Sequence, residues 1–424
     1  MIFRSFKLFF AALIAALLLV ACNSGDPAPA PSGLAVTAGE SSVTVSWDMT
    51  DGVEYWLFFG PSSAAPSSTT SMQGWFGLPG GNVVIKATSP YVVSGLVNGL
   101  SYSFSVNGRT NGGPGGPGAT PVTATPRIAG SSWSAGSAIS GSVGLRGLTY
   151  GATTATTTTN SVANFVAAGA AGAIYASLDG VTWNAINYAT SSNINGAAYF
   201  GTFKLVGDGG LVLTSSDAAT WTAQTSGTSQ NLYAIASNYS NLNVAVGANG
   251  TIITSPDGVT WTAATSSATS RDLYAVAYTS YNSGTWVAVG AGGTVVESAD
   301  GLTWHGVTSG STADLRGVAY TTSTSTDGVV SYTFVAVGAS GTVLSSTDAS
   351  TWTAQAVSGA GALNAVVYGT QFVAVGAAGK IFISTDGLNW TLTPAATSQD
   401  LYAVAHGSLD YSAVGAAGTN LLSR

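Results

Sequence analysis

The sequence predicts an all-β protein of 424 residues, with a β-sandwich in its first third and a seven-bladed β-propeller after it. Hydrophobic residues make up 46% of the chain and include 11 Trp, 17 Tyr and 14 Phe, so the chain must fold although only 7% of it is charged. About seven short strands of alternating polarity precede residue 127. After residue 131 a strand–turn–strand pattern recurs at a spacing that predicts propeller blades.

The charge balance narrows the class of partner. Eleven basic and eighteen acidic residues give a net charge of −7, so we expect no surface that attracts nucleic acid. The one cysteine, Cys22, cannot form a disulfide within the chain.

Residues 1–22 read as a leader, with Arg4 and Lys7 ahead of an apolar run that ends in Leu-Val-Ala-Cys. This resembles a bacterial lipoprotein signal peptide, which implies that Cys22 is lipidated and becomes the mature N-terminus. A plain signal peptide or a membrane anchor is the alternative, but the run is short for a spanning helix. Asn23 stands where inner-membrane lipoproteins commonly carry Asp, so the resemblance implies an anchor in the outer membrane. The sequence leaves open whether the protein faces the periplasm or the exterior. Residues 23–32 alternate Pro with small residues and predict an extended tether.

Residues 33–127 predict the sandwich, since they hold short strands, turn residues and no cysteine. We expect strands at 33–38, 41–48, 53–60, 82–88, 91–96, 101–110 and 120–126. The motifs Pro31-x-x-Leu34-x-Val36 and Val43-x-Val45-x-Trp47, and Leu96 six residues before Tyr102, resemble the fibronectin type III family. The resemblance implies that Trp47 and Tyr102 lie in the core. The Ser- and Gly-rich segment 62–81 departs from the short loops of that family.

Residues 131–424 carry the repeat, in which a strand ending in Gly is followed by a second Gly three residues later. Seven such pairs occur: Gly169/Gly172, Gly207/Gly210, Gly247/Gly250, Gly290/Gly293, Gly338/Gly341, Gly376/Gly379 and Gly415/Gly418. They are 38 to 48 residues apart, which suits a four-stranded blade and is too long for one turn of a β-helix. The chain enters at Trp133 with a lone fourth strand, and we expect 131–137 to complete the blade of 401–423.

Six turns have the pattern Ser-x-Asp followed by Trp, which resembles the Asp-box (BNR repeat) of sialidase-type propellers. Their acids are Asp179, Asp217, Asp257, Asp300, Asp348 and Asp386. Asp and Ser accept backbone N–H groups in tight turns, and equivalent residues spread around a ring cannot converge on one substrate, so a structural role is expected. Ala218 and Ala349 replace the Gly after Asp in two copies, which leaves the turn type open.

A sialidase-like glycoside-processing enzyme that uses the propeller mouth is the alternative function. That resemblance would require three converging Arg, a Tyr/Glu pair and an acid Asp, but the propeller offers only Arg146, Arg271, Arg316 and Arg424. Its one Glu, Glu297, is expected on the face opposite the mouth, and His305 and His406 lack partners at metal-ligand spacing. We therefore expect no catalytic residue, no metal and no cofactor.

The residue after each inner-strand Leu or Ile is the strongest candidate for binding. These residues are Arg146, Asn195, Tyr233, Tyr274, Arg316, Asn364 and Tyr402. Repeat symmetry places them at one level near the channel opening, and binding sites favour Arg, Tyr and Asn. Two competing interpretations remain. These seven residues could instead pack between blades or line a water-filled channel. Alternatively, recognition lies on the opposite face, which carries the long inserts 150–165 and 320–334.

The repeat LYAVAY…FVAVGxxGT…SxDGxxW also resembles the photosystem II stability and assembly factor family over residues 131–424. That resemblance implies a non-enzymatic propeller that holds a protein partner. Most of the Arg-rich patch of the family is missing, with Arg146 and Arg316 alone in candidate positions, so the photosynthetic partner is not implied. The expected function is that of a monomeric, lipid-anchored envelope protein that binds a protein or glycan partner.

Overall fold

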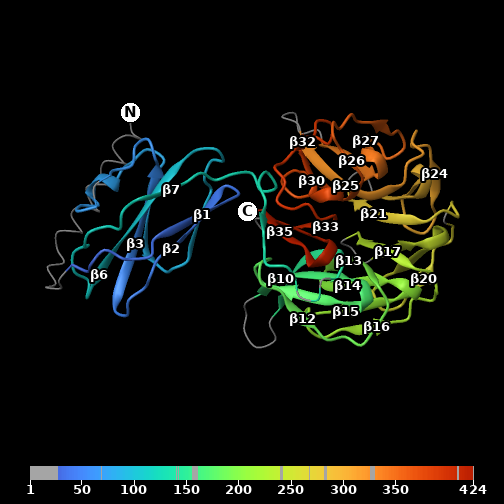
Figure 1. Cartoon of the computed structure of the whole chain (residues 1–424), viewed down its shortest axis with the longest axis horizontal. Coiled ribbons are helices and arrows are strands. Elements are labelled where there is room, and N and C mark those ends of the chain that lie inside the picture. Colours follow the sequence, from blue (N-terminus) through green and yellow to red (C-terminus); the bar gives the residue numbers. More distant parts are fainter. Residues whose placement is uncertain are drawn as a thin grey trace. The chain divides into compact units, whose positions relative to one another are not determined.

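The structure is a computed structural model that describes residues 27–67, 69–139, 141, 143–154, 161–238, 242–266, 268–280, 284–324, 330–407 and 410–423. These residues fall into two compact units, one ending at Ile128 and the other beginning at Ala129 (Figure 1). Apart from single 3-10 turns, the described residues hold only strands, which confirms the all-β class. No helix among them is long and apolar enough to span a membrane. Cys22 and the expected leader lie outside the described residues.

The first unit consists of two antiparallel sheets. One has the order β1-β2-β5, from β1 (Ala35–Gly39), β2 (Ser42–Ser46) and β5 (Tyr91–Ser94). The other has the order β4-β3-β6-β7, from β4 (Asn82–Ala87), β3 (Val53–Pro61), β6 (Tyr102–Thr110) and β7 (Val122–Ala124).

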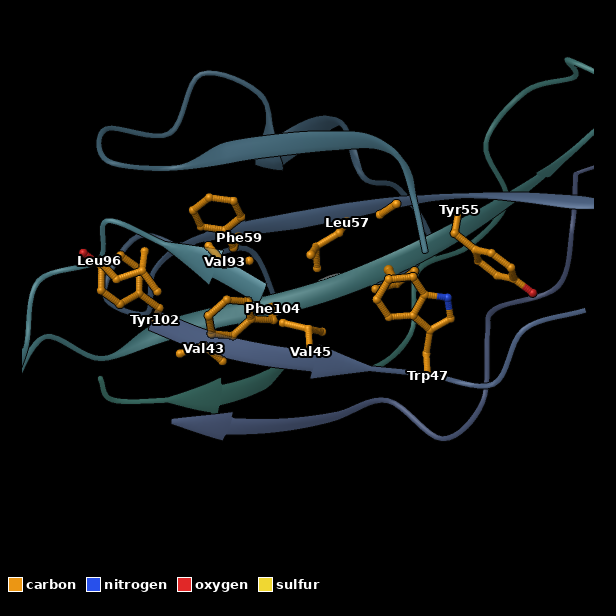
Figure 2. Close-up of a cluster of buried hydrophobic side chains, with 12 residues drawn as sticks. Val43, Val45, Trp47, Tyr55, Leu57, Phe59, Val93, Leu96, Tyr102 and Phe104 are labelled. Carbon is orange, nitrogen blue, oxygen red and sulfur yellow. The ribbon is translucent and has the colours of Figure 1, made fainter. Parts of the chain in front are cut away.

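Alternating apolar residues of the two sheets form the core of the first unit (Figure 2). Trp47 and Tyr55 lie at one end of this cluster with their ring centroids 6.0 Å apart. Tyr102 lies at the other end, and its hydroxyl accepts a 3.2 Å hydrogen bond from the backbone N–H of Val97. Trp47 and Tyr102 are both 5% exposed, so the two residues expected in the core are buried.

The segment 62–81 packs on the first unit through a small cluster of its own. Met72 and Trp75, the latter in a 3-10 turn (Gln73–Trp75), are buried against Phe58 of β3. Phe76 meets the Phe58 ring edge-on at 5.6 Å. The insert therefore covers a second apolar face of β3 that the alternating pattern alone does not account for.

The described part of the expected tether, residues 27–32, contacts the first unit at its beginning. Pro27 forms a β-bridge with Arg109, and Ala28 is 1% exposed. A Cβ added at Gly116 would collide with the carbonyl oxygen of Ala28, so a residue without a side chain is needed there. The Gly/Pro loop before β7 thus makes room for the incoming chain.

The second unit contains seven four-stranded antiparallel sheets within its described residues. The first three are β9 (Leu145–Thr154), β10 (Ser161–Gly169), β11 (Ile174–Ser177), β12 (Asn184–Ile186); β13 (Ile194–Phe200), β14 (Thr202–Gly207), β15 (Val212–Ser215), β16 (Thr222–Gln224); and β17 (Leu232–Ser237), β18 (Asn243–Gly247), β19 (Ile252–Ser255), β20 (Thr262–Ala263). The next two are β21 (Leu273–Thr279), β22 (Thr285–Gly290), β23 (Val295–Ser298), β24 (His305–Val307); and β25 (Leu315–Thr324), β26 (Val330–Gly338), β27 (Val343–Ser346), β28 (Thr353–Ala354). The last two are β29 (Leu363–Tyr368), β30 (Phe372–Gly376), β31 (Ile381–Ser384), β32 (Thr391–Leu392); and β33 (Leu401–His406), β34 (Tyr411–Gly415), β35 (Asn420–Ser423), β8 (Ser134–Ala135).

The sheets surround a common centre (Figure 1). The first strand of each sheet contacts the first strand of the next, and β33 contacts β9. In β18, β30 and β34 every residue is buried, because neighbouring sheets cover both faces of these strands. The repeated four-stranded sheets expected from the Gly spacing are therefore present.

The last sheet joins the two ends of the second unit. β8 pairs with β35 through Leu421↔Ala135 and Leu422↔Ser134. The Ser423 hydroxyl accepts a 2.8 Å hydrogen bond from the Gly130 N–H and donates to the carbonyl of Ser132. Residues nearly 300 positions apart thus share one sheet, with β8 at the place expected for 131–137.

Candidate functional site

The seven candidate residues share one local structure, because each is the extra residue of a β-bulge. In β13, for example, Ile194 pairs with Gly207 and Gly196 pairs with Val206, so Asn195 has no partner across the ladder. The same shift follows the first residue of each of the other six inner strands. Bulges bend a strand and re-aim a side chain.

The repeated glycines make this bulge possible. A Cβ on Gly207 would collide with the carbonyl oxygen of Asn193, just before the bulged strand, and the first Gly of each other pair meets the equivalent carbonyl. The second Gly of each pair has a positive φ, as at Gly210 with +76°, and a Cβ there would collide with the carbonyl oxygen of Thr228 in the segment leading to the next sheet. The Gly-x-x-Gly spacing thus shapes both the bulge and the contact between sheets.

The bulged residues line one cavity of about 350 Å³, and Asp314 lines it as well. The seven are Arg146, Asn195, Tyr233, Tyr274, Arg316, Asn364 and Tyr402. A second space of about 240 Å³ borders the same seven residues and the next residues of the inner strands, among them Gly147 and Ala275. We call the opening formed by these two adjoining spaces the mouth. The volume of the first space, about 350 Å³, lies in the range of small-ligand pockets.

Two arginine–asparagine pairs stand in the mouth. The Arg146 guanidinium donates to Asn195 Oδ1 at 3.3 Å, and Arg316 donates to Asn364 Oδ1 at 2.8 Å. Each Asn amide in turn donates to a main-chain carbonyl of the next inner strand, Leu232 at 3.1 Å and Leu401 at 2.8 Å. These bonds orient the guanidinium groups and leave their other N–H donors available.

The order Arg, Asn, Tyr occurs twice around the mouth. Arg146, Asn195 and Tyr233 stand in three consecutive sheets, and Arg316, Asn364 and Tyr402 in three others, with Tyr274 between the two sets. The mouth therefore presents two similar polar sets rather than seven unrelated side chains.

Three tyrosines line the mouth, and two of them, Tyr233 and Tyr274, are neighbours. The rings of Tyr233 and Tyr274 lie 5.5 Å apart at 51°. Burial first and the carboxylate of Asp272 second raise the pKa of both phenols, so both remain neutral hydrogen-bond donors at neutral pH.

The sequence reasoning missed the residue before each inner strand. In five repeats the side-chain oxygen of this residue accepts a hydrogen bond of 2.8 to 3.0 Å from the backbone N–H at the centre of the Gly-x-x-Gly turn of the preceding sheet. The acceptors are Asn193, Asn231, Asp272, Asp314 and Asp400. A visible signal existed, because Asn or Asp stands directly before the inner strand in five of the seven repeats. Asp314 additionally places a carboxylate in the mouth.

The six Ser-x-Asp turns lie away from the mouth, each with its Asp bonded within its own turn. Asp257 Oδ1 accepts the N–H groups of Val259 and Thr260, both at 2.8 Å, and the Ser255 hydroxyl at 3.0 Å. The backbone N–H groups of Thr260 and Val259, with that hydroxyl, lower the pKa of Asp257 to about 2. Asp179, Asp217, Asp300, Asp348 and Asp386 make the corresponding bonds.

The two turns without Gly keep the same conformation. Ala218 and Ala349 adopt φ of 62° and 64°, in the left-handed region that Gly takes in the other copies. Asp217 and Asp348 still accept two backbone N–H groups each. The turn type is therefore unchanged, and alanine carries the backbone strain in these two copies.

The remaining ionisable candidates lie outside the mouth lining. Glu297 accepts the Ser350 hydroxyl at 3.1 Å in the region of the Ser-x-Asp turns. His406 is half-buried, its ring centroid lies 4.7 Å from that of Tyr411, and its partial burial lowers its pKa. His305 opens the outer strand β24, and Arg271 donates to the Gly292 carbonyl at 3.3 Å. Among the residues with a described position, no three His, Cys, Asp or Glu gather as a metal site.

Comparison with known proteins shows the fold of the second unit. No protein-family model and no curated protein sequence matches the chain. Solved structures do match: YCF48 bound to D1 peptide, with 15% identity, a TM-score of 0.52, and coverage of 69% of this chain and 94% of that one. YCF48 from Cyanidioschyzon merolae matches at 16% identity and a TM-score of 0.52, covering 69% of this chain and 98% of that one. The WD40 β-propeller domain of Doa1 matches at 9% identity and a TM-score of 0.51, covering 69% and 97%. The second unit is accordingly a β-propeller.

Proposed function

We propose that the protein binds a polypeptide segment of a partner protein at the mouth of a seven-bladed propeller, without catalysis. The observation that carries this proposal is the convergence of seven bulged side chains on one cavity of about 350 Å³. Bulges weaken the ladder locally, so seven of them that present polar side chains to one opening favour recognition over mere channel filling. In this account the pairing of β8 with β35 closes the ring.

The chemistry of the mouth suits a peptide. A peptide backbone offers carbonyl acceptors and N–H donors, and the mouth provides guanidinium donors, phenolic hydroxyls and the Asp314 carboxylate. The adjacent rings of Tyr233 and Tyr274 give an apolar wall for a side chain. A neighbour of the same fold, YCF48, has a structure bound to a D1 peptide, which supports a peptide as the ligand class.

The mouth fits an enzyme less well. Asp314 is the one carboxylate among the described residues that line the main cavity, whereas a paired-acid glycosidase needs two. Arg146 and Arg316 are each held by a separate Asn, so the arrangement offers no three-arginine cluster. These two features favour binding over the sialidase-like alternative.

We place this propeller on a membrane-anchored protein. In this proposal the first unit is a fibronectin type III-like spacer, supported by its two sheets and the buried Trp47 and Tyr102. Cys22 is lipidated in the outer membrane, supported by the leader pattern of residues 1–22. The variant Cys22→Ala is then expected to accumulate as unprocessed precursor. A mature protein with a free amine at another residue, found by mass spectrometry, would contradict the anchor.

Replacing both mouth arginines is expected to weaken peptide binding by about 1 to 3 kcal/mol, the usual worth of charge-assisted hydrogen bonds. Peptides selected from a random displayed library against the wild-type protein would be titrated calorimetrically against Arg146→Ala/Arg316→Ala. The control Arg271→Ala/Lys380→Ala removes the same charge outside the cavity lining and should leave affinity unchanged. The proposal would be contradicted if the mouth variant bound the selected peptides as tightly as the wild-type protein. It would also be contradicted if no peptide were selected and the wild-type protein bound a glycan instead.

A further inference from the structure

Lys204 occupies a position in β14 where most of the other sheets carry valine. The equivalent residues are Val166, Val244, Val287, Val335 and Val373, with Ser412 in the last sheet. Lys204 is 3% exposed, almost as buried as these valines. Burying an ammonium group costs free energy unless it is paired, so the exchange of valine for lysine calls for a compensating partner.

The described residues supply only part of that compensation. Lys204 Nζ donates to the Thr202 hydroxyl at 2.9 Å and, at longer distances, to the Phe200 carbonyl at 3.3 Å and the Thr202 carbonyl at 3.5 Å, all of them neutral acceptors. Among the described residues, no carboxylate forms an ion pair with Lys204 within 4.0 Å. Burial lowers the pKa of Lys204 to about 8, which still leaves the ammonium form predominant at pH 7.

Lys204 borders a cavity of about 510 Å³. The cavity is lined by the turn that joins β13 to β14 and by the Ser255 turn of the next sheet, so it lies at the end of β13 opposite the bulged Asn195. Its wall is made by Phe200, Gly201, Thr202, Lys204, Ser237, Asn243, Pro256 and Asp257. The volume is that of a small-molecule site.

The same wall carries a fixed negative charge. Asp257 stays ionised because turn N–H groups lower its pKa to about 2. Its three turn bonds all end on Oδ1. A simple anion near Lys204 would thus meet the Asp257 carboxylate, and a simple cation would meet the ammonium group, so a ligand with both charges is compensated best.

We propose that the cavity beside Lys204 binds a small zwitterion of the α-amino-acid class, with its carboxylate on Lys204 Nζ and its ammonium group on Asp257. This site is separate from the mouth and serves a small molecule rather than a polypeptide. The pairing gives the buried lysine the counter-charge that the described residues lack.

The test titrates the purified protein with the twenty common amino acids, first by thermal shift and then by calorimetry. We expect at least one amino acid to bind, and its analogues without the amine or without the carboxylate to bind at least about tenfold more weakly. The variant Lys204→Val, which carries the residue of the other sheets and is expected to fold, should lose binding at least about tenfold. Asp257→Asn keeps an oxygen for the turn and should show a similar loss.

Lys204→Gln is a second variant, used in case the valine variant does not fold, and it keeps a polar group that can bond to the Thr202 hydroxyl. Loss of binding in both folded variants supports the proposal. It is overturned if no amino acid binds the wild-type protein, if Lys204→Val binds as tightly as wild type, or if the analogue without the amine binds equally well. Wild-type protein that binds none of the twenty amino acids and melts at a lower temperature than Lys204→Val would also refute the site. In that case the lysine would serve only as a cap on the β13–β14 turn.

Discussion

A chain that ends at Tyr411 is expected to lose the cooperative unfolding transition of its second unit. The truncation removes most of β34 and all of β35, including Ala413, Val414 and Leu421, which are 0% exposed. Each buried aliphatic side chain contributes about 1.5 to 3 kcal/mol, and a domain has only about 5 to 15 kcal/mol of net stability. The cut would also expose the edges of β33 and β8, which pair with the removed strands.

The measurement is denaturant unfolding of the second unit, followed by circular dichroism. Because a truncation is drastic, a matched pair of point variants tests the same contact in the full chain. Leu421→Ala, at a fully buried site in β35, should cost about 2 to 5 kcal/mol, whereas Leu392→Ala, 50% exposed in β32, should cost less than about 0.5 kcal/mol. An unchanged midpoint in the truncated chain would show that the last sheet does not hold the ring together.

Gly210→Ala is expected to destabilise the second unit by about 3 kcal/mol or more, and Gly209→Ala by less than about 1 kcal/mol. Both glycines have positive φ in the same 3-10 turn (Asp208–Gly210). A Cβ at Gly210 would collide with the Thr228 carbonyl oxygen, whereas a Cβ at Gly209 would meet nothing within 4 Å. The position of Gly209 is taken by Ala171, Ala378 and Ala417 in other sheets, with φ between 51° and 55°.

The comparison of these two neighbours isolates the backbone contact from the general cost of a left-handed alanine. Thermal unfolding of the two variants beside wild type measures it. Equal losses in both would mean that strain at positive φ alone, and not the approach of the next sheet, explains the second Gly of the repeat.

Much of the fold could be predicted because the repeat is a physical requirement. Gly207 must lack a side chain for the bulge at Asn195 to form, and Gly210 must lack one for the next sheet to approach, so their spacing is visible in the sequence. The residue after each inner-strand Leu or Ile could be placed at one level by symmetry for the same reason. The bulge itself, which directs those side chains to the mouth, is a shift in the hydrogen-bond register between two strands. Such a shift leaves no mark in the pattern of polar and apolar residues, so it could not be predicted from the sequence.

Other features could not be predicted because they depend on contacts distant in sequence. Ala28 is buried through the Gly116 loop, although its Pro-rich neighbours are typical of a free tether. The burial of Lys204 depends on the turn of the following sheet, where a Cβ on Gly258 would approach the lysine Cε to 2.7 Å. The asparagines and aspartates before the inner strands act on the turn of a different sheet, so within one repeat they look like ordinary loop residues.

Site-specific photo-crosslinking tests the proposed binding role of the mouth most directly. A benzophenone amino acid would replace Tyr274 in the mouth and, as the control, Leu388, which is 47% exposed in a Ser-x-Asp turn. In cells that express the protein, we expect a defined crosslinked polypeptide from position 274, its yield reduced by Arg146→Ala/Arg316→Ala, and none from position 388. A crosslinked polypeptide from position 388 with none from position 274 would contradict binding at the mouth and move the site to the opposite face.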